Sequence, residues 1–130
     1  VSLDPRLNPL GDPRPPMQYM MLPRRWLHDR LLLSGDQASL VFATDDGMAP
    51  SIPKNGIAII DSSKTSMDDT SSIHAILIKG NVRLRRIEQG PDYIIARPDN
   101  HHVPIDFIAA RHAGTMTILG RVRAVISTVD

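Results

Sequence analysis

Short apolar runs separated by turn signals make up most of the chain after residue 37. The runs are rich in Ile, Val, Leu and Ala, and Gly, Pro, Asn or Asp lies between most of them. Runs of this length and spacing are typical of β-strands, and Gly80-Asn81 is a two-residue hairpin signal. We therefore predict a mainly β domain, with a bulge or bend at Gly120. The predicted strands are residues 38–44, 56–61, 73–79, 82–88, 93–97, 103–107 and 115–128.

The N-terminal part of the chain has a different character, because six of the 11 prolines lie within its first 23 residues. Proline fixes φ and removes a backbone donor, so residues 1–22 are predicted to be an extended arm or linker. Pro23 can open a helix, and we predict one short helix over residues 23–33, ended by Ser34-Gly35-Asp36. The predicted division is an arm at 1–22 and one folded domain at 23–130.

Composition excludes several classes of partner and site. The 130 residues carry 15 basic and 14 acidic side chains, whereas a domain that binds nucleic acid by itself usually has a basic excess. We therefore do not expect this chain to bind nucleic acid directly. The absence of cysteine excludes disulfides and thiolate zinc sites and fits a cytoplasmic protein. No apolar run reaches the roughly 18 residues that span a bilayer, so we expect no membrane partner. Since the chain opens on Val1 rather than Met, we expect a fragment that lacks a further N-terminal domain.

Other side chains with possible chemistry have simpler explanations. His101 and His102 are adjacent, so an extended backbone points them to opposite sides, and no His-x-x-x-His spacing is present. We predict no metal and no cofactor, and interpret the histidines as polar loop residues. Ser51 is interpreted as a turn hydroxyl.

The order of several short motifs carries a family resemblance. A helix containing Trp26-Leu27 precedes Gly47-Met48-Ala49-Pro50, and Ile52-Pro53-Lys54-Asn55-Gly56 leads into an apolar strand ending in Asp61. Later motifs are Arg85-Arg86-Ile87 at the end of a hairpin strand, Asp99-Asn100, and Ile118-Leu119-Gly120-Arg121-Val122. In this order the chain resembles, over about residues 23–127, the C-terminal domain of LexA-like and phage CI-type repressors, the self-cleaving Ser/Lys peptidase family. The resemblance implies an irregular β-fold of short strands and hairpins.

The resemblance also locates a catalytic dyad, and the chain departs from it at both positions. The family's nucleophilic serine falls on Gly47, and its general-base lysine falls on Arg85. Glycine has no hydroxyl to attack with, and arginine stays protonated at physiological pH, so it cannot act as the base. The resemblance therefore implies a pseudo-enzyme with vestigial positions Gly47 and Arg85. It does not reveal whether Gly47 is natural or engineered.

The residues around the vestigial dyad suggest what has replaced it. Met48 and the carboxylates Asp45 and Asp46 are expected to line the former cleft, together with Arg83. Arg83 and Arg85 share one face of a strand. Because an enclosed arginine needs a partner, we predict an ion pair between Arg85 and Asp45 or Asp46.

The family cuts itself at a small-residue–Gly bond upstream of the domain. The only glycine before the predicted helix is Gly11, and it follows a bulky leucine, Leu10. The predicted arm therefore carries a vestigial cleavage region, and the sequence does not locate a scissile bond.

As to function, the resemblance implies the oligomerisation and regulatory domain of a DNA-binding transcriptional repressor from a phage, prophage or bacterium. It implies a homodimer or higher homo-oligomer, and contact with operator DNA through a missing N-terminal helix-turn-helix domain. Induction would come from an antirepressor protein or a ligand rather than from self-cleavage. We predict the dimer surface at residues 115–128 or at the exposed hairpin edge. The alternatives are an active self-cleaving or serine peptidase with a relocated nucleophile, and a stand-alone peptide- or protein-binding module.

Overall fold

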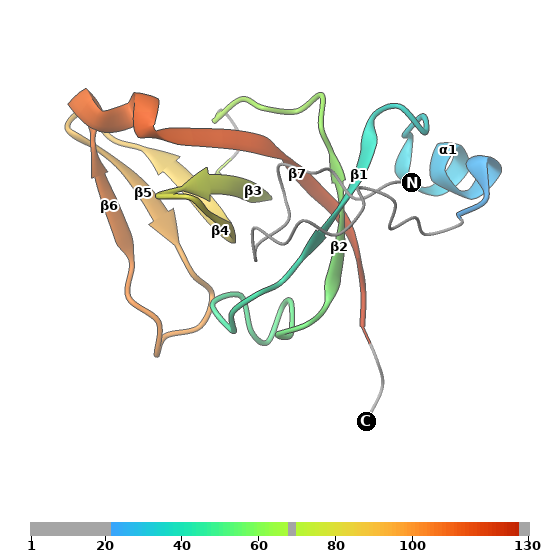
Figure 1. The fold of residues 1–130 in the computed structure, drawn as a ribbon, viewed down its shortest axis with the longest axis horizontal. Helices are drawn as coiled ribbons and strands as arrows, with labels where there is room; N and C mark the ends of the chain where they lie inside the picture. Colours follow the sequence, from blue (N-terminus) through green and yellow to red (C-terminus); the bar gives the residue numbers. More distant parts are fainter. Residues whose placement is uncertain (1–21, 68–69, 128–130) are drawn as a thin grey trace.

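The computed structural model describes residues 22–67 and 70–127. Within them, seven strands form one sheet in the order β1-β2-β7-β3-β4-β5-β6, and every neighbouring pair is antiparallel (Figure 1). The mainly β prediction is confirmed. Of the predicted arm, residues 1–21 lie outside the described residues. The elements are α1 (Arg24–Leu31), β1 (Ala38–Phe42), β2 (Ile57–Asp61), β3 (Ile73–Ile78), β4 (Asn81–Gln89), β5 (Tyr93–Arg97), β6 (Asp106–Ala109), the 3-10 helix η2 (Ala110–Thr115) and β7 (Met116–Ile126).

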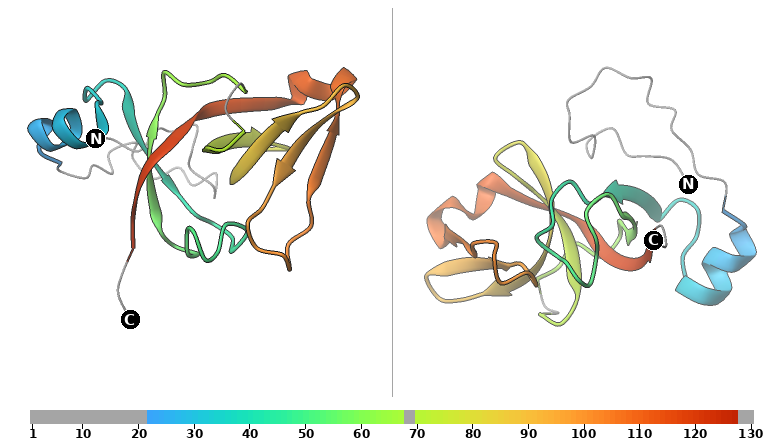
Figure 2. Two further views of the ribbon diagram at one scale, coloured as in Figure 1. Left: turned by 180° about the vertical axis from the view of Figure 1, so that it is seen from behind. Right: turned by 90° about the horizontal axis from the view of Figure 1, so that it is seen from below.

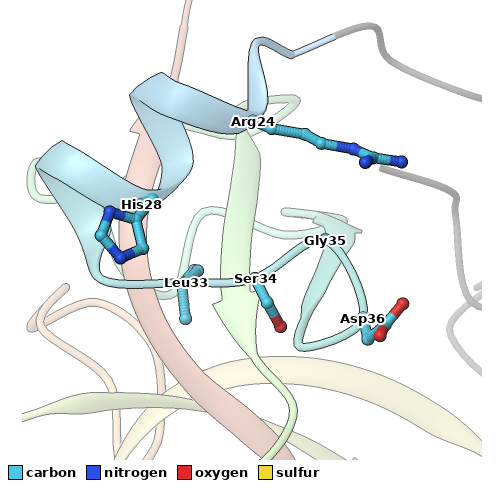
Figure 3. Close-up of a pocket in the computed structure, with 6 residues that line it drawn as sticks. All are labelled: Arg24, His28, Leu33, Ser34, Gly35 and Asp36. Atoms are coloured by element: carbon cyan, nitrogen blue, oxygen red, sulfur yellow. The ribbon is translucent and has the colours of Figure 1, made fainter.

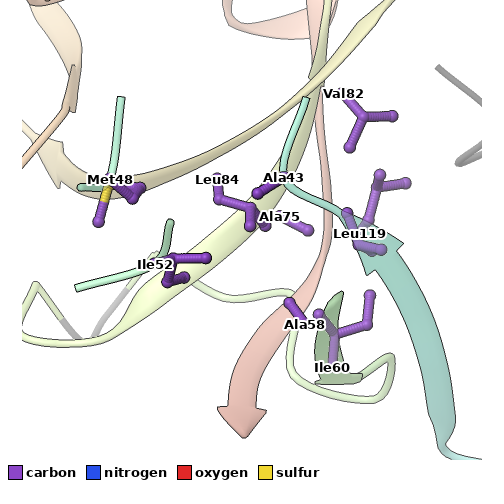
Figure 4. Close-up of a cluster of buried hydrophobic side chains, with 10 residues drawn as sticks. Ala43, Met48, Ile52, Ala58, Ile60, Ala75, Val82, Leu84 and Leu119 are labelled. Atoms are coloured by element: carbon purple, nitrogen blue, oxygen red, sulfur yellow. The ribbon is translucent and has the colours of Figure 1, made fainter. Parts of the chain in front are cut away.

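Three apolar clusters hold the sheet together, and two of them cover opposite faces of its β1–β2 part. One lies between α1 and the strands β1 and β2, and it contains Leu27, Leu31, Leu33, Ala38, Leu40 and Ile59. The second lies on the opposite face of β1 and β2, where these strands meet β3, β4 and the turn after β1 (Figure 4). The third, between β3 and β6, contains Ile76, Ile78, Ile87, Ile94, Ala96 and Ile108. Figures 1 and 2 show α1 at one end of the molecule and the β5–β6 hairpin at the other.

Strand β7 links the two halves of the sheet. Its first half pairs with β3 and its second half with β2, and the register shifts once in each pairing. One shift lies beside Gly120, as predicted, and a Cβ on Gly120 would lie 2.5 Å from the carbonyl oxygen of Asp61. This close backbone approach explains the glycine. Because β7 lies inside the sheet, the predicted dimer surface at 115–128 is not a continuous free edge.

The helix is shorter than predicted. Pro23 is its N-cap, and the helix ends at Leu31, before the predicted stop at Ser34-Gly35-Asp36. Leu32 takes a left-handed conformation (φ 55°), and the N–H of Leu33 donates to the carbonyl of Leu27. The chain therefore reverses at an exposed leucine, which lets Leu33 return to the apolar cluster under the helix.

Two further sequence predictions are corrected. The predicted strand at 103–107 is wrong in position, because β6 covers Asp106–Ala109 and is followed by a 3-10 helix that the sequence did not predict. The hairpin turn between β3 and β4 consists of Lys79 and Gly80, both with positive φ, and Ile78 pairs with Asn81. A two-residue turn was correctly predicted, but at Gly80-Asn81, one residue later in the chain than the observed turn.

Candidate functional site

The candidate site is the turn between β1 and β2, together with the part of β4 that faces it. Backbone hydrogen bonds close the turn at its base, from Ala43 N–H to the Gly56 carbonyl (2.9 Å) and from Asn55 N–H to the Ala43 carbonyl (2.8 Å). Inside it, Met48 and Ile52 are almost fully buried in the second apolar cluster (Figure 4). The two apolar side chains therefore anchor the turn and fix the position of Gly47.

Gly47 lies directly against the guanidinium group of Arg85. A Cβ built on Gly47 would lie 2.4 Å from Nη1, 2.5 Å from Cζ and 2.6 Å from Nη2 of Arg85. No real Cβ tolerates such distances, so the arginine occupies the space that any side chain at position 47 would need. Arg85 is 1% exposed. The two positions that the resemblance pairs are thus in contact.

Asp45 is the carboxylate partner of this guanidinium. Arg85 donates from Nη1 to Oδ1 (3.2 Å) and from Nη2 to Oδ2 (3.0 Å), and Arg83 Nη1 lies 2.9 Å from Oδ2. The backbone N–H of Gly47 also donates to Oδ1, at 2.9 Å. The predicted ion pair is therefore present, with Asp45 rather than Asp46.

The environment of Asp45 favours its charged form. Burial raises the pKa of Asp45, but the hydrogen bonds from Arg85 and from the Gly47 N–H, and then the charges of Arg85 and Arg83, outweigh that effect. The net result is a pKa below the ordinary value. Arg85 also donates from Nη1 to the carbonyl of Leu84 (2.7 Å), while its buried Nε has no hydrogen-bond partner among the residues that the structure describes.

A second ion pair holds the loop after β5. Arg86 points to the other side of β4 and binds Asp99 through Nε (2.8 Å) and Nη2 (3.1 Å), and it also donates to the carbonyl of Ser71. Ser51 Oγ donates to the same carboxylate at 2.6 Å. The pKa of Asp99 is lowered, first by the hydrogen bond from Arg86, against burial, and then by Ser51 and nearby positive charge. The same bond raises the pKa of Arg86.

Asn100 connects this loop to the Gly47 turn. Its backbone N–H donates to the carbonyl of Gly47 (2.9 Å), and its side-chain amide donates to the carbonyl of Asp46 (3.0 Å). Its Oδ1 accepts from the N–H of His102 at 2.9 Å. The turn is therefore fixed by β4 through Asp45 and by the β5–β6 loop through Asn100.

A comparison with protein families finds a match over most of the chain. The family described as Peptidase S24-like matches residues 11–123, which is most of the chain. The chain belongs to this family. The match begins inside the predicted arm, twelve residues earlier than the resemblance seen from the motifs, which began at residue 23. A search of curated proteins found no match.

The S24-like domain brings together some of the expected cleft residues and separates others. Asp45, Arg83, Arg85 and Gly47 form one contact group, and Met48 is buried beside it. Asp46 is exposed, and within the described part of the chain its carbonyl alone takes part, accepting from Asn100 and Ala49. Of the described residues, no three His, Asp or Glu side chains are arranged to hold a metal ion. No described helix is long and apolar enough to cross a membrane.

Sequence reasoning missed a buried row of ionisable residues that leads to Arg85. Strand register places Asp61 opposite Arg121, Arg121 opposite His74, and His74 opposite Arg85, on four neighbouring strands. Asp61, His74 and Arg85 are all at least 95% buried. The interpretation of His74 as a polar loop residue is wrong, since it lies in β3, within the strand that was predicted at 73–79. The signal that could have revealed it is its place in an otherwise apolar run, 73–78.

Proposed function

We propose that this chain is the regulatory and oligomerisation domain of a DNA-binding transcriptional repressor and that it does not cleave itself. Membership of the S24-like family supports a LexA-like domain. The observation that carries the rest is the contact between Gly47 and Arg85, because it occupies the place where the family's chemistry would occur.

The chemistry of a Ser/Lys dyad has three requirements. A hydroxyl must attack, a neutral amine must accept its proton, and hydrogen-bond donors must stabilise the oxyanion. Position 47 has no hydroxyl, and position 85 carries a guanidinium bound to Asp45. The N–H of Gly47, a candidate oxyanion donor, is already bound to Asp45. Each requirement is therefore unmet in a different way.

The sheet offers an edge for a dimer. In β7, residues 121–126 pair with β2, whereas β3 pairs only with residues 116–121. Among the described residues, the side of Val122–Ile126 that faces away from β2 is therefore unpaired. Two copies related by a two-fold axis could pair along this segment. The near-neutral charge suits a domain whose operator contacts come from a separate helix-turn-helix domain.

Without self-cleavage, induction needs another route. We propose an antirepressor protein or a ligand that changes the dimer, in a cytoplasmic regulator of phage, prophage or bacterial origin. Dimer formation is tested by sedimentation equilibrium of the chain, with Ile126→Arg, at the exposed end of this segment, as the disruptive variant.

The experiment on cleavage incubates the purified protein at alkaline pH, and separately with an activated recombinase filament, and measures intact mass over time. We expect only the full-length mass, while a self-cleaving family member treated in parallel yields two fragments. A discrete pair of fragments from this chain would overturn the proposal.

One observation supports the alternative that the chain is a peptidase with a relocated nucleophile. Ser51 Oγ donates a short hydrogen bond, 2.6 Å, to Asp99. Asp99 is held by Arg86, so this carboxylate is a poor proton acceptor, and we expect no labelling by a fluorophosphonate probe. Stoichiometric labelling that Ser51→Ala abolishes would favour the peptidase.

A further inference from the structure

We propose that a hollow between α1 and the turn that follows it binds a small zwitterion carrying both a carboxylate and an ammonium group, such as a free amino acid. The hollow has a volume of about 370 Å³, which falls in the range of small-molecule sites, roughly 300–1,000 Å³ (Figure 3). No residue of the Gly47 site lines it, so this inference goes beyond the proposed function. Its lining residues are Arg24, His28, Leu33, Ser34, Gly35 and Asp36.

The backbone forms the hollow before any ligand arrives. The reversal at Leu32 brings Leu33 beneath the helix, where its side chain is buried in the first apolar cluster and holds the turn against α1. The following turn is closed by two hydrogen bonds, from Gln37 N–H to the Ser34 carbonyl (3.1 Å) and from Ser34 N–H to Gln37 Oε1 (3.2 Å). Because helix and turn are both fixed, binding would require little ordering of the backbone.

The charges around the hollow determine the class of ligand. Arg24 and His28 are four residues apart and so share one face of α1, while Asp36 lies on the turn (Figure 3). Within the described residues, neither Arg24 nor Asp36 makes an ion pair. Opposite charges therefore border one space without neutralising each other. A carboxylate beside Arg24 and an ammonium beside Asp36 would give each of these two charges a partner.

Titration followed by proton–nitrogen correlation NMR tests this, with L-leucine as the zwitterion, acetate as the anion alone and n-butylammonium as the cation alone. We expect L-leucine to shift the amide signals of Leu33, Gly35 and Asp36 and to saturate. Acetate and n-butylammonium should bind at least roughly tenfold more weakly, because each leaves one protein charge unmatched.

Single substitutions test whether L-leucine binds in the hollow rather than elsewhere on the surface. Arg24→Gln and Asp36→Asn should each weaken L-leucine binding at least roughly fivefold, whereas Arg30→Gln, on the same helix but outside the lining, should leave it unchanged. Gly35→Leu should block binding without unfolding, since a Cβ at Gly35 meets no atom within 4 Å. The proposal is overturned by no shift with L-leucine, by equal binding of acetate, or by binding that survives both Arg24→Gln and Gly35→Leu. None of these results depends on whether the chain cleaves itself.

Discussion

Replacing Gly47 by serine tests whether this glycine and Arg85 depend on each other. The new Cβ would lie 2.4 Å from Arg85 Nη1, while two hydrogen bonds to Asp45 and one to the Leu84 carbonyl hold the guanidinium in place. The buried arginine cannot move away without losing its carboxylate. Breaking a buried ion pair costs about 3–5 kcal/mol. Because Asp45 is one-third exposed and keeps Arg83, we expect Gly47→Ser to lower the free energy of unfolding by roughly 2–4 kcal/mol.

A double-mutant cycle with Arg85→Lys provides the decisive comparison. Arg85→Lys alone removes charged hydrogen bonds and should cost roughly 1–3 kcal/mol. Lysine has no planar fork against position 47, so the double variant should escape the clash and cost at least ~1 kcal/mol less than the sum. Urea unfolding of the four proteins measures this, and Gly47→Ser combined with Arg25→Lys, whose partner Asp29 lies on α1, is the control, expected to be additive within ~0.5 kcal/mol. Strict additivity in the first cycle would refute the idea that Arg85 excludes a side chain at position 47.

Two further predictions follow from neighbouring contacts. Since the folded pKa of Asp45 is below its ordinary value of 3.8, the carboxylate stabilises the fold above that pH, and this stabilisation is lost as the pH falls through the lower folded value. Urea unfolding between neutral and strongly acidic pH should therefore show a steeper loss of unfolding free energy for the unsubstituted protein than for Asp45→Asn, and identical profiles would contradict this prediction. Gly120→Ala should destabilise by roughly 2–4 kcal/mol, because its Cβ would meet the Asp61 backbone, while Gly114→Ala, with no atom within 4 Å, should stay within ~0.5 kcal/mol; equal effects would refute the packing argument.

Most of the strands could be predicted because local signals determine them. The strand at 93–97 matches β5 at both ends, and most others differ by one or two residues. The failure at 103–107 has a different cause. The loop before β6 forms hydrogen bonds with residues that are far away in the sequence. Asn100 bonds to the Gly47 turn, and Asp99 bonds to Arg86 and Ser51. Contacts between residues so far apart leave no trace in a local apolar pattern.

The residues of the candidate site, like the strands, could be predicted only in part from the sequence. Strand alternation places Arg83 and Arg85 on one face, and both bind one carboxylate in the structure. The choice of Asp45 over Asp46 depends on the turn, in which Asp45 also accepts the N–H of Gly47. The burial of His74 between Arg85 and Arg121 depends on the register of three strands. Neither feature can be derived from one segment alone.

Under the proposed function, glycine at position 47 and arginine at position 85 form one structural unit, and they are not two independent losses of catalytic groups. A flat guanidinium fits against position 47 only when that residue has no Cβ, and glycine leaves no void there because the guanidinium fills the space. The ion pair with Asp45 then compensates the buried charge and fixes the turn to β4. Restoring serine alone would give the hydroxyl no base, and restoring lysine alone would give the base no hydroxyl. Only the double replacement recreates both reacting groups, so it is also the variant in which cleavage could return.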